Sequence, residues 1–172
     1  MDNISIIIRN RNEAEFIGFA IQSSLDFFEK PEIIVMDNNS TDDSLQVVQY
    51  FNDRTDIKIH NVKNYRPGQS INQGVSLSKN EYILVLSAHT QIINLDFELV
   101  KKELDSHLAV FGKQVPIFRG KKITPRYIWS NFNDKKEINK FSSIENRLFL
   151  HNAFCFYKRD SLIKYPMPEI YA

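Results

Sequence analysis

Polar side chains follow three short apolar runs of the sequence, at Arg9 to Glu13, Asp37 to Asp43 and Ser87 to Thr90. In open α/β sheets, ligands bind at the carboxyl ends of the strands, where these clusters fall. Asp37 can accept hydrogen bonds from a base or a ribose, and the turn at 38–40 begins a helix whose free amides can bind an anion. The clusters favour a nucleotide site, although such a run is also a common turn with a helix N-cap.

The elements around these clusters alternate as they do in an α/β domain, with a central sheet flanked by helices. Strands are expected at Ile4–Ile8, Ile33–Met36, Ile57–Ile59 and Tyr82–Leu86, within Ala109–Phe118, and at Asn152–Tyr157. Helices are expected at Glu13–Phe28, from Ser40 through Phe51, from Pro67 to about Asn80, and briefly after Arg159. From Arg119 onward the periodicity is poor, which predicts a long functional loop or an irregular subdomain.

The composition is that of one globular domain, with 172 residues, 42% hydrophobic and 25% charged. A net charge of +1 gives no general field for nucleic acid, so no nucleic-acid partner is expected. Cys155 is the one cysteine, which rules out an internal disulfide and favours a reducing compartment. The apolar runs are too short to span a bilayer, and no signal peptide is evident. We therefore expect a cytoplasmic location.

Three motifs resemble the opening of family 2 glycosyltransferases, which have the GT-A fold. A first strand followed by Asn12-Glu13 precedes a second strand that ends in Asp37-Asn38-Asn39-Ser40-Thr41-Asp42, similar to the family's Asp-x-x-Ser-x-Asp. The spacing of about 25 residues between them is also similar. Gly68-Gln69-Ser70-Ile71-Asn72-Gln73-Gly74 resembles the family's Gly-x-x-x-Asn-x-Gly segment. The order of the three motifs makes the resemblance specific.

The resemblance implies a site for a nucleotide-sugar donor. By this analogy Asp37 contacts the nucleobase, Glu13 lines the nucleotide pocket, and Gly74 permits a close approach of the backbone. For Gly74 a close helix–strand contact without ligand is the alternative, because a glycine within a helix costs about 1 kcal/mol relative to alanine and needs a reason. The residues assigned to the donor are Arg9, Arg11, Glu13, Asp37, Asn39, Asn72, Gly74 and Ser87.

The end of the fourth strand departs from the family pattern. The family has Asp-x-Asp there, which holds a divalent cation against the diphosphate. This sequence has Ser87-Ala88-His89, a variant seen in some members together with a Gly-x-Gln-x-Pro segment like Gly112-Lys113-Gln114-Val115-Pro116. Three interpretations of His89 remain: a ligand for Mn²⁺ or Mg²⁺, a phosphate contact in a metal-independent site, or a structural residue at the strand end.

The catalytic base is the second departure. An inverting transfer needs a carboxylate to deprotonate the acceptor hydroxyl, and the family supplies it from an acidic pair after a segment like Asn152–Arg159. Glu169 is the candidate here, although the sequence reads more like the lead-in to that pair. We therefore expect residues 1–118 to form the nucleotide-sugar-binding half. Residues 119–172 would form an incomplete acceptor-side segment of the same domain, in a portion of a longer enzyme.

The implied function is transfer of a sugar from a nucleotide-sugar donor to a polysaccharide or glycolipid acceptor, with inversion. One alternative is a non-catalytic nucleotide-sugar-binding or regulatory subunit. Another is a sugar nucleotidylyltransferase, which would need a glycine-rich loop with a lysine after the first strand, whereas 9–13 has no glycine.

A basic group after the Gly-x-Gln-x-Pro segment admits two interpretations. It could bind a phosphorylated lipid acceptor, with peripheral contact to a membrane, or it could be a solvated loop. Tyr127 and Trp129 nearby could pack against an acceptor sugar or belong to the core. The basic residues are Arg119, Lys121, Lys122 and Arg126.

Overall fold

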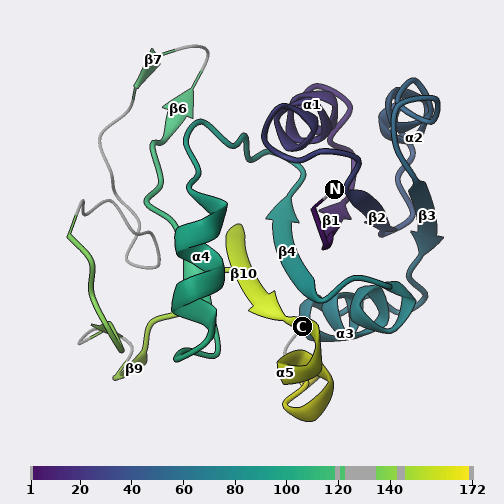
Figure 1. The fold of residues 1–172 in the computed structure, drawn as a ribbon. Coiled ribbons are helices and arrows are strands. Elements are labelled where there is room, and N and C mark those ends of the chain that lie inside the picture. Colours follow the sequence, from purple (N-terminus) through teal and green to yellow (C-terminus); the bar gives the residue numbers. More distant parts are fainter. Residues whose placement is uncertain (1, 119–120, 123–134, 143–145, 171–172) are drawn as a thin grey trace.

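The chain folds around a six-stranded sheet with the order β3-β2-β1-β4-β10-β5 (Figure 1). The structure is a computed structural model that describes residues 2–118, 121–122, 135–142 and 146–170. β1 to β4 run parallel, and β10 is antiparallel to both β4 and β5, so the predicted mostly parallel sheet is confirmed. The strands are β1 (Ile4–Asn10), β2 (Glu32–Asp37), β3 (Ile57–Asn61), β4 (Tyr82–Ser87), β5 (Val110–Phe111) and β10 (Phe154–Lys158).

Helices cover both faces of this sheet, which explains why its central strands are apolar without alternation. Side chains of β1 alternate between the two cores, with Ile6 in one and Ile7 in the other. α1 (Ile17–Phe27), α2 (Ser44–Gln49) and α4 (Phe97–Leu104) lie over the Ile6 face. α3 (Pro67–Leu77) and α5 (Arg159–Lys164) lie over the Ile7 face (Figure 1).

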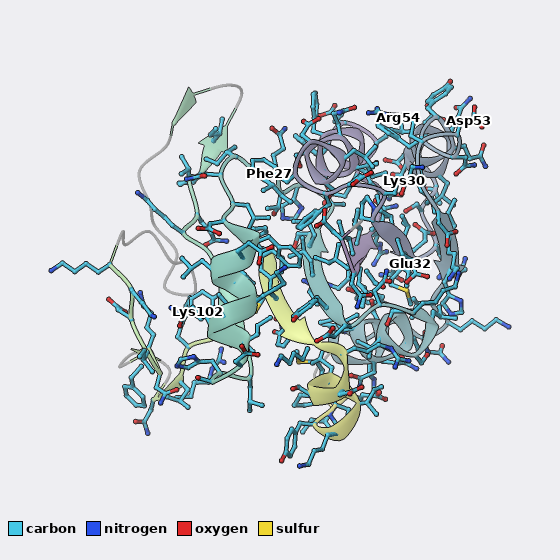
Figure 2. All side chains as sticks on the ribbon, viewed as in Figure 1. Phe27, Lys30, Glu32, Asp53, Arg54 and Lys102 are labelled. Carbon is cyan, nitrogen blue, oxygen red and sulfur yellow. The ribbon has the colours of Figure 1, made fainter. Side chains whose placement is uncertain are left out.

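The turn that follows α2 carries Asp53 and Arg54 at the outer edge of the domain (Figure 2). There the Arg54 guanidinium donates to Gln22 of α1, with 2.6 Å between the Arg54 Nη1 and Gln22 Oε1 atoms. Among the described residues, no helix combines the length and the apolar character that crossing a bilayer requires.

Two predicted elements differ from the sequence-based expectation. The helix expected from Glu13 begins at Ile17, because the backbone amides of Glu13 and Ala14 bond to the side chains of Ser44, the first residue of α2, and of Asp42 in the loop before it. The strand expected within 109–118 is divided into β5 and β6 (Ile117–Phe118), separated by the segment that contains Pro116. Three further short strands form small hairpins with their neighbours: β7 (Lys121–Lys122) pairs with β6, and β8 (Phe141–Ser142) pairs with β9 (Arg147–Leu148).

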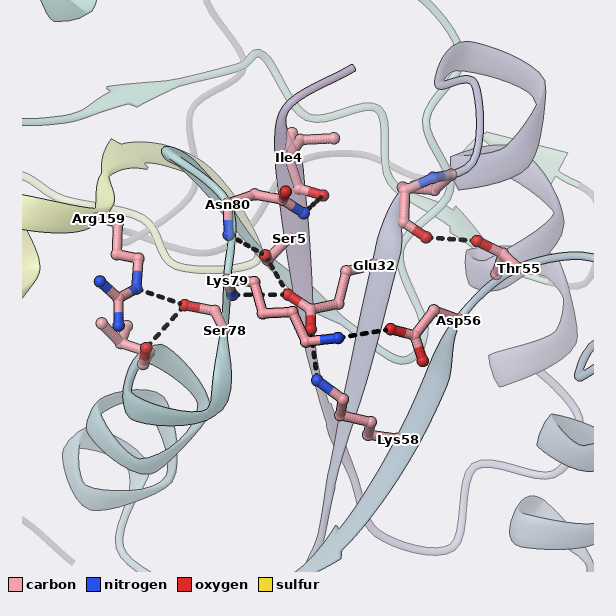
Figure 3. Close-up of polar contacts among 12 residues, drawn as sticks. Ile4, Ser5, Glu32, Thr55, Asp56, Lys58, Ser78, Lys79, Asn80 and Arg159 are labelled. Carbon is pink, nitrogen blue, oxygen red and sulfur yellow. Dashed lines mark hydrogen bonds and ion pairs between the residues drawn. The ribbon is translucent and has the colours of Figure 1, made fainter. Parts of the chain in front are cut away.

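A buried carboxylate joins the amino ends of the strands, at the edge of the sheet opposite the predicted site (Figure 3). Glu32 of β2 accepts hydrogen bonds from Ser5 Oγ (2.5 Å), Lys58 Nζ (2.5 Å) and the backbone N–H of Lys79 (2.9 Å). Burial by itself would raise the pKa of Glu32, but these hydrogen bonds and the charge of Lys58 lower it below its ordinary value of 4.5. Glu32 therefore has a structural role, fixing three strands and the turn before β4.

Candidate functional site

The three polar clusters meet in one open cleft of about 650 Å³ at the carboxyl ends of β1, β2 and β4. Strand register brings them together, since Arg9 pairs with Ser87 across β1 and β4, and Asn10 pairs with Asp37 across β1 and β2. Five residues that the sequence assigned to the donor or to a metal line this cleft, and their contacts with a ligand remain predictions: Arg9, Arg11, Glu13, Ser87 and His89. The other lining residues are Asn10, Asn38, Asn64 and Tyr65.

Asp37 lies beneath the cleft, because its side chain is only 1% exposed and bonds within the protein. Its carboxylate accepts hydrogen bonds from Asn10 Nδ2 (2.9 Å), the backbone N–H of Ser40 (3.0 Å) and Ser40 Oγ (2.6 Å). Asp37 thus holds the turn after β2 against β1, and its contact with a nucleobase remains a prediction. Asn39 is exposed in this turn with φ 51°, a left-handed conformation that asparagine tolerates, and it does not line the cleft.

The loop after β1 is bonded along its length to the loop after β2. Asn12 accepts from the backbone N–H of Thr41 (2.8 Å), and Asp42 accepts from that of Ala14 (2.9 Å). Ser44 Oγ accepts from the backbone N–H of Glu13 (2.8 Å). The Asp-x-x-Ser-x-Asp motif therefore builds the loop that presents Glu13 to the cleft, a role that its sequence pattern alone does not reveal.

Glu13 and His89 form a direct pair at the cleft. Glu13 Oε1 lies 3.0 Å from Nδ1 of the histidine ring, and the His89 side chain is 60% exposed whereas that of Glu13 is 24% exposed. A carboxylate bonded to one ring nitrogen fixes the tautomer and orientation of an imidazole, leaving the other nitrogen for a ligand. Glu13 is therefore a positioning residue for His89.

Arg9 lines the cleft, and part of its guanidinium has no hydrogen-bond partner in the protein. Its Nη2 donates to the backbone oxygen of Asn152 over a long 3.4 Å, and its buried Nε has no hydrogen-bond partner. The side chain of Asn152 accepts a hydrogen bond from the Tyr157 hydroxyl, which holds this contact in place from below. Asn10 contributes a second unsatisfied atom at the cleft, its buried Oδ1. Buried polar atoms normally have partners, so these two unpaired atoms set Arg9 and Asn10 apart from the other residues that line the cleft.

His151 lies close enough to Arg9 for the charge of the arginine to act on it. Burial lowers the pKa of His151, and the positive charge of Arg9 lowers it further. The amide Nε2 of Gln114 lies 2.9 Å from Nε2 of this ring, so the Gly-x-Gln-x-Pro segment contacts His151. Because the lowered pKa disfavours protonation of His151, Arg9 carries the positive charge of this pair.

Asn72 and Gly74 do not line the cleft, although the sequence assigned both to the nucleotide. A Cβ at Gly74 would lie 2.7 Å from Cγ2 of Ile7, so this glycine makes the close helix–strand contact that was the alternative. The Asn72 side chain pairs with the backbone of Met167, donating to its oxygen (2.9 Å) and accepting from its N–H (2.9 Å).

A C-terminal strap, residues 167–169, lies against the start of α3. Asn72 Nδ2 also donates to Glu169 Oε1 (2.7 Å), and Arg66 Nη1 donates to the Glu169 backbone oxygen (2.9 Å). Gly68 makes room for the strap, since a Cβ there would lie 2.0 Å from the backbone oxygen of Pro168. The exposed Glu169 is therefore held beside α3. Its partner Arg66 directly follows Asn64 and Tyr65, which line the cleft.

The sequence analysis did not identify Asn64, Tyr65 or Arg66, and it placed Gly68 in a motif without giving it a role. The first two follow the carboxyl end of β3, which is the signal that could have found them. The strap contacts lack a local signal, because the partners are about a hundred residues apart. Several expectations for the basic and aromatic segment lie outside the described residues, namely those for Arg119, Arg126, Tyr127, Trp129 and the side chains of Lys121 and Lys122.

Residues 5–165 match the family described as glycosyl transferase family 2, and the chain belongs to this family. It is similar to the poly-beta-1,6-N-acetyl-D-glucosamine synthase of Staphylococcus epidermidis, with 28% identity over 95 residues. That match covers 54% of this chain and 23% of the synthase, so the matched region is about a quarter of the length of this curated relative.

Solved glycosyltransferases share the fold. S. aureus TarS 1-349 in complex with UDP aligns with a TM-score of 0.69 at 20% identity, over 96% of this chain and 50% of that chain. The mannosyltransferase PcManGT from Pyrobaculum calidifontis, in complex with GDP-Man and Mn²⁺, aligns with a TM-score of 0.68 at 16% identity, over 98% of this chain and 48% of that chain. The predicted GT-A fold is thereby confirmed.

Proposed function

We propose that the chain is the donor-binding part of a glycosyltransferase that moves a sugar from a nucleoside diphosphate sugar to a polysaccharide or glycolipid acceptor, with inversion. The observation that carries the proposal is the meeting of Arg9, Glu13, Ser87 and His89 in one cleft on a family 2 fold. In the reaction the acceptor oxygen attacks the anomeric carbon, the bond to the diphosphate breaks, and the nucleoside diphosphate leaves with its negative charge.

UDP-N-acetylglucosamine is the first donor to test. Its support is that TarS has been solved with UDP-GlcNAc and that the staphylococcal relative is a poly-N-acetylglucosamine synthase. GDP-mannose is the second, because PcManGT holds GDP-Man and aligns equally well. A cytoplasmic reaction at a membrane surface, with a lipid-linked or glycan acceptor, remains part of the proposal.

Glu169 remains the proposed base among the described residues. An inverting transfer needs its carboxylate to take the proton of the acceptor hydroxyl. In the structure Oε1 of Glu169 accepts a hydrogen bond from Asn72, so this oxygen is already engaged by the protein. This bond supports the alternative that the chain binds a donor without turning it over.

Binding and turnover can be measured separately. UDP and GDP are titrated into the chain by calorimetry, and release of UDP or GDP from the two donors is followed with an oligosaccharide acceptor. We expect one of the two nucleotides to bind. Glu13→Gln should weaken the affinity for that nucleotide by about tenfold, because the His89 ring loses the charge-assisted hydrogen bond that orients it. Arg54→Gln, at the outer edge of the domain, is the control (Figure 2). Failure of both nucleotides to bind would refute the proposal, whereas binding without release would favour the non-catalytic alternative.

A further inference from the structure

The carboxylates around the cleft are already engaged by protein groups. Mg²⁺ and Mn²⁺ prefer several oxygen ligands, with carboxylates foremost. Asp37 bonds to Asn10 and Ser40, and Asp42 bonds to the amides of Ala14 and Ser44. Glu13 is the acidic residue that lines the cleft, and one of its oxygens contacts His89.

These residues do not fit the divalent-cation site that the family pattern implies. Within 2–118, 121–122, 135–142 and 146–170, no group of three or more His, Cys, Asp or Glu side chains could hold a metal ion. Glu13 and His89 alone offer one carboxylate and one imidazole, which is a weak set for a hard cation. The charge on a donor diphosphate must therefore be met by other groups of the cleft.

Arg9 and Arg11 are the two arginines that line the cleft, and Arg9 is the one whose guanidinium is held by a hydrogen bond to the backbone of Asn152. A guanidinium carries five N–H donors, and in the structure the Arg9 guanidinium makes one long bond to the backbone of Asn152. Its Nε is buried without a partner, an arrangement that costs free energy. Oxygen atoms of a diphosphate match the fork of a guanidinium, and such paired bonds are the strong ones.

The surroundings of Arg9 keep it aimed at the end of β4. Its backbone pairs with Ser87 and accepts a hydrogen bond from the N–H of Ala88 (3.4 Å), which places it beside His89. Asn152 holds one end of the guanidinium, and its own side chain is held by Tyr157. The Arg9 side chain is thus partly fixed before a ligand binds, which lowers the entropy that binding would cost.

We propose that this cleft binds the diphosphate of its donor through the Arg9 guanidinium, with His89 held beside it by Glu13, in place of a divalent cation. The inference rests on the proposed function. Because negative charge grows on the diphosphate as the sugar leaves, a fixed guanidinium there would stabilise the departing group as well as the bound donor.

The test is titration of UDP and of GDP into the full chain, in EDTA and again in Mn²⁺. We expect the dissociation constant of the bound nucleotide to be the same in both solutions. Arg9→Gln should weaken binding by about 10- to 100-fold, the range for loss of charge-assisted hydrogen bonds. Arg9→Lys, which keeps the charge and loses the fork, should fall between Arg9→Gln and the natural chain. Arg54→Gln removes the same charge outside the cleft and should change nothing.

Each result has one meaning. Binding that requires Mn²⁺ overturns this inference and leaves the proposed function standing. Binding in EDTA that Arg9→Gln weakens no more than Arg54→Gln overturns the assignment to Arg9. No binding of either nucleotide in either solution overturns the proposed function itself. Thermal denaturation checks the fold of each variant, and if Arg9→Gln does not fold, a metal-independent loss of affinity in Arg9→Lys decides the matter.

Discussion

Replacing Gly68 with alanine should detach the C-terminal strap from α3. A Cβ at this position would lie 2.0 Å from the carbonyl oxygen of Pro168 and 2.8 Å from its carbon. Both are main-chain atoms, so a change of rotamer cannot relieve the overlap. The strap must move away from the helix, or the helix must shift from the sheet.

The size of the effect follows from the contacts that the strap would lose. Four hydrogen bonds tie it to Arg66 and Asn72, and two of them are at exposed positions. Bonds of this kind contribute about 0.5–1.5 kcal/mol each. If the two exposed bonds lie at the low end of that range, the docking free energy of the strap is about 2–3 kcal/mol. Alanine in a helix gains about 1 kcal/mol over glycine, so the free energy of global unfolding should fall by only about 1–2 kcal/mol.

Amide hydrogen exchange distinguishes this local release from global unfolding. The N–H of Met167 donates to Asn72 Oδ1, and loss of about 2 kcal/mol should reduce its protection by about 30-fold. Amides of β1 should lose less protection, because the helix propensity of alanine offsets part of the loss for global unfolding. Ser76→Ala, at an exposed position of the same helix, raises helix propensity without touching the strap and serves as the control. Unchanged protection at Met167 in Gly68→Ala would refute the reasoning.

Three further outcomes can be checked on the purified chain. Glu32→Gln should lower the free energy of unfolding at pH 7 by about 1–3 kcal/mol, because the Lys58 pair loses its charge. Because the pKa of Glu32 is lowered in the folded state, its carboxylate stabilises the fold above the ordinary value of 4.5, and this stabilisation is lost as the pH falls through the folded-state pKa. In urea titrations from pH 7 to 3, the free energy of unfolding should therefore fall less steeply in Glu32→Gln than in the natural chain. Gly74→Ala should lower the thermal midpoint, since crowding against Ile7 costs about 1–3 kcal/mol against a helix gain of about 1, and a raised midpoint would contradict that contact. Burial raises the pKa of Cys155 to about 12, so iodoacetamide at pH 8 should label this thiol only after unfolding, and rapid labelling of the native chain would show that the strand opens.

The sheet and the position of the cleft were predictable from the sequence. Continuous apolar runs such as Ile4–Ile8 specify strands that are covered on both faces, and in a parallel sheet the polar residues after such runs share one edge. That local logic brought Arg9, Glu13 and His89 together correctly. It succeeded because strand formation and the direction of parallel strands depend on short-range pattern, which a sequence displays directly.

Tertiary structure alone decided what several motif residues do. Asp37 is bonded to Asn10 beneath the cleft, and Asn72 holds Met167, 95 residues further along the chain. Gly74 serves its contact with Ile7, and Gly68 serves the strap. A motif records that a residue type is required, and both a ligand and a distant backbone segment can impose the same requirement. Only the folded arrangement shows which neighbour fills the space and takes the hydrogen bonds.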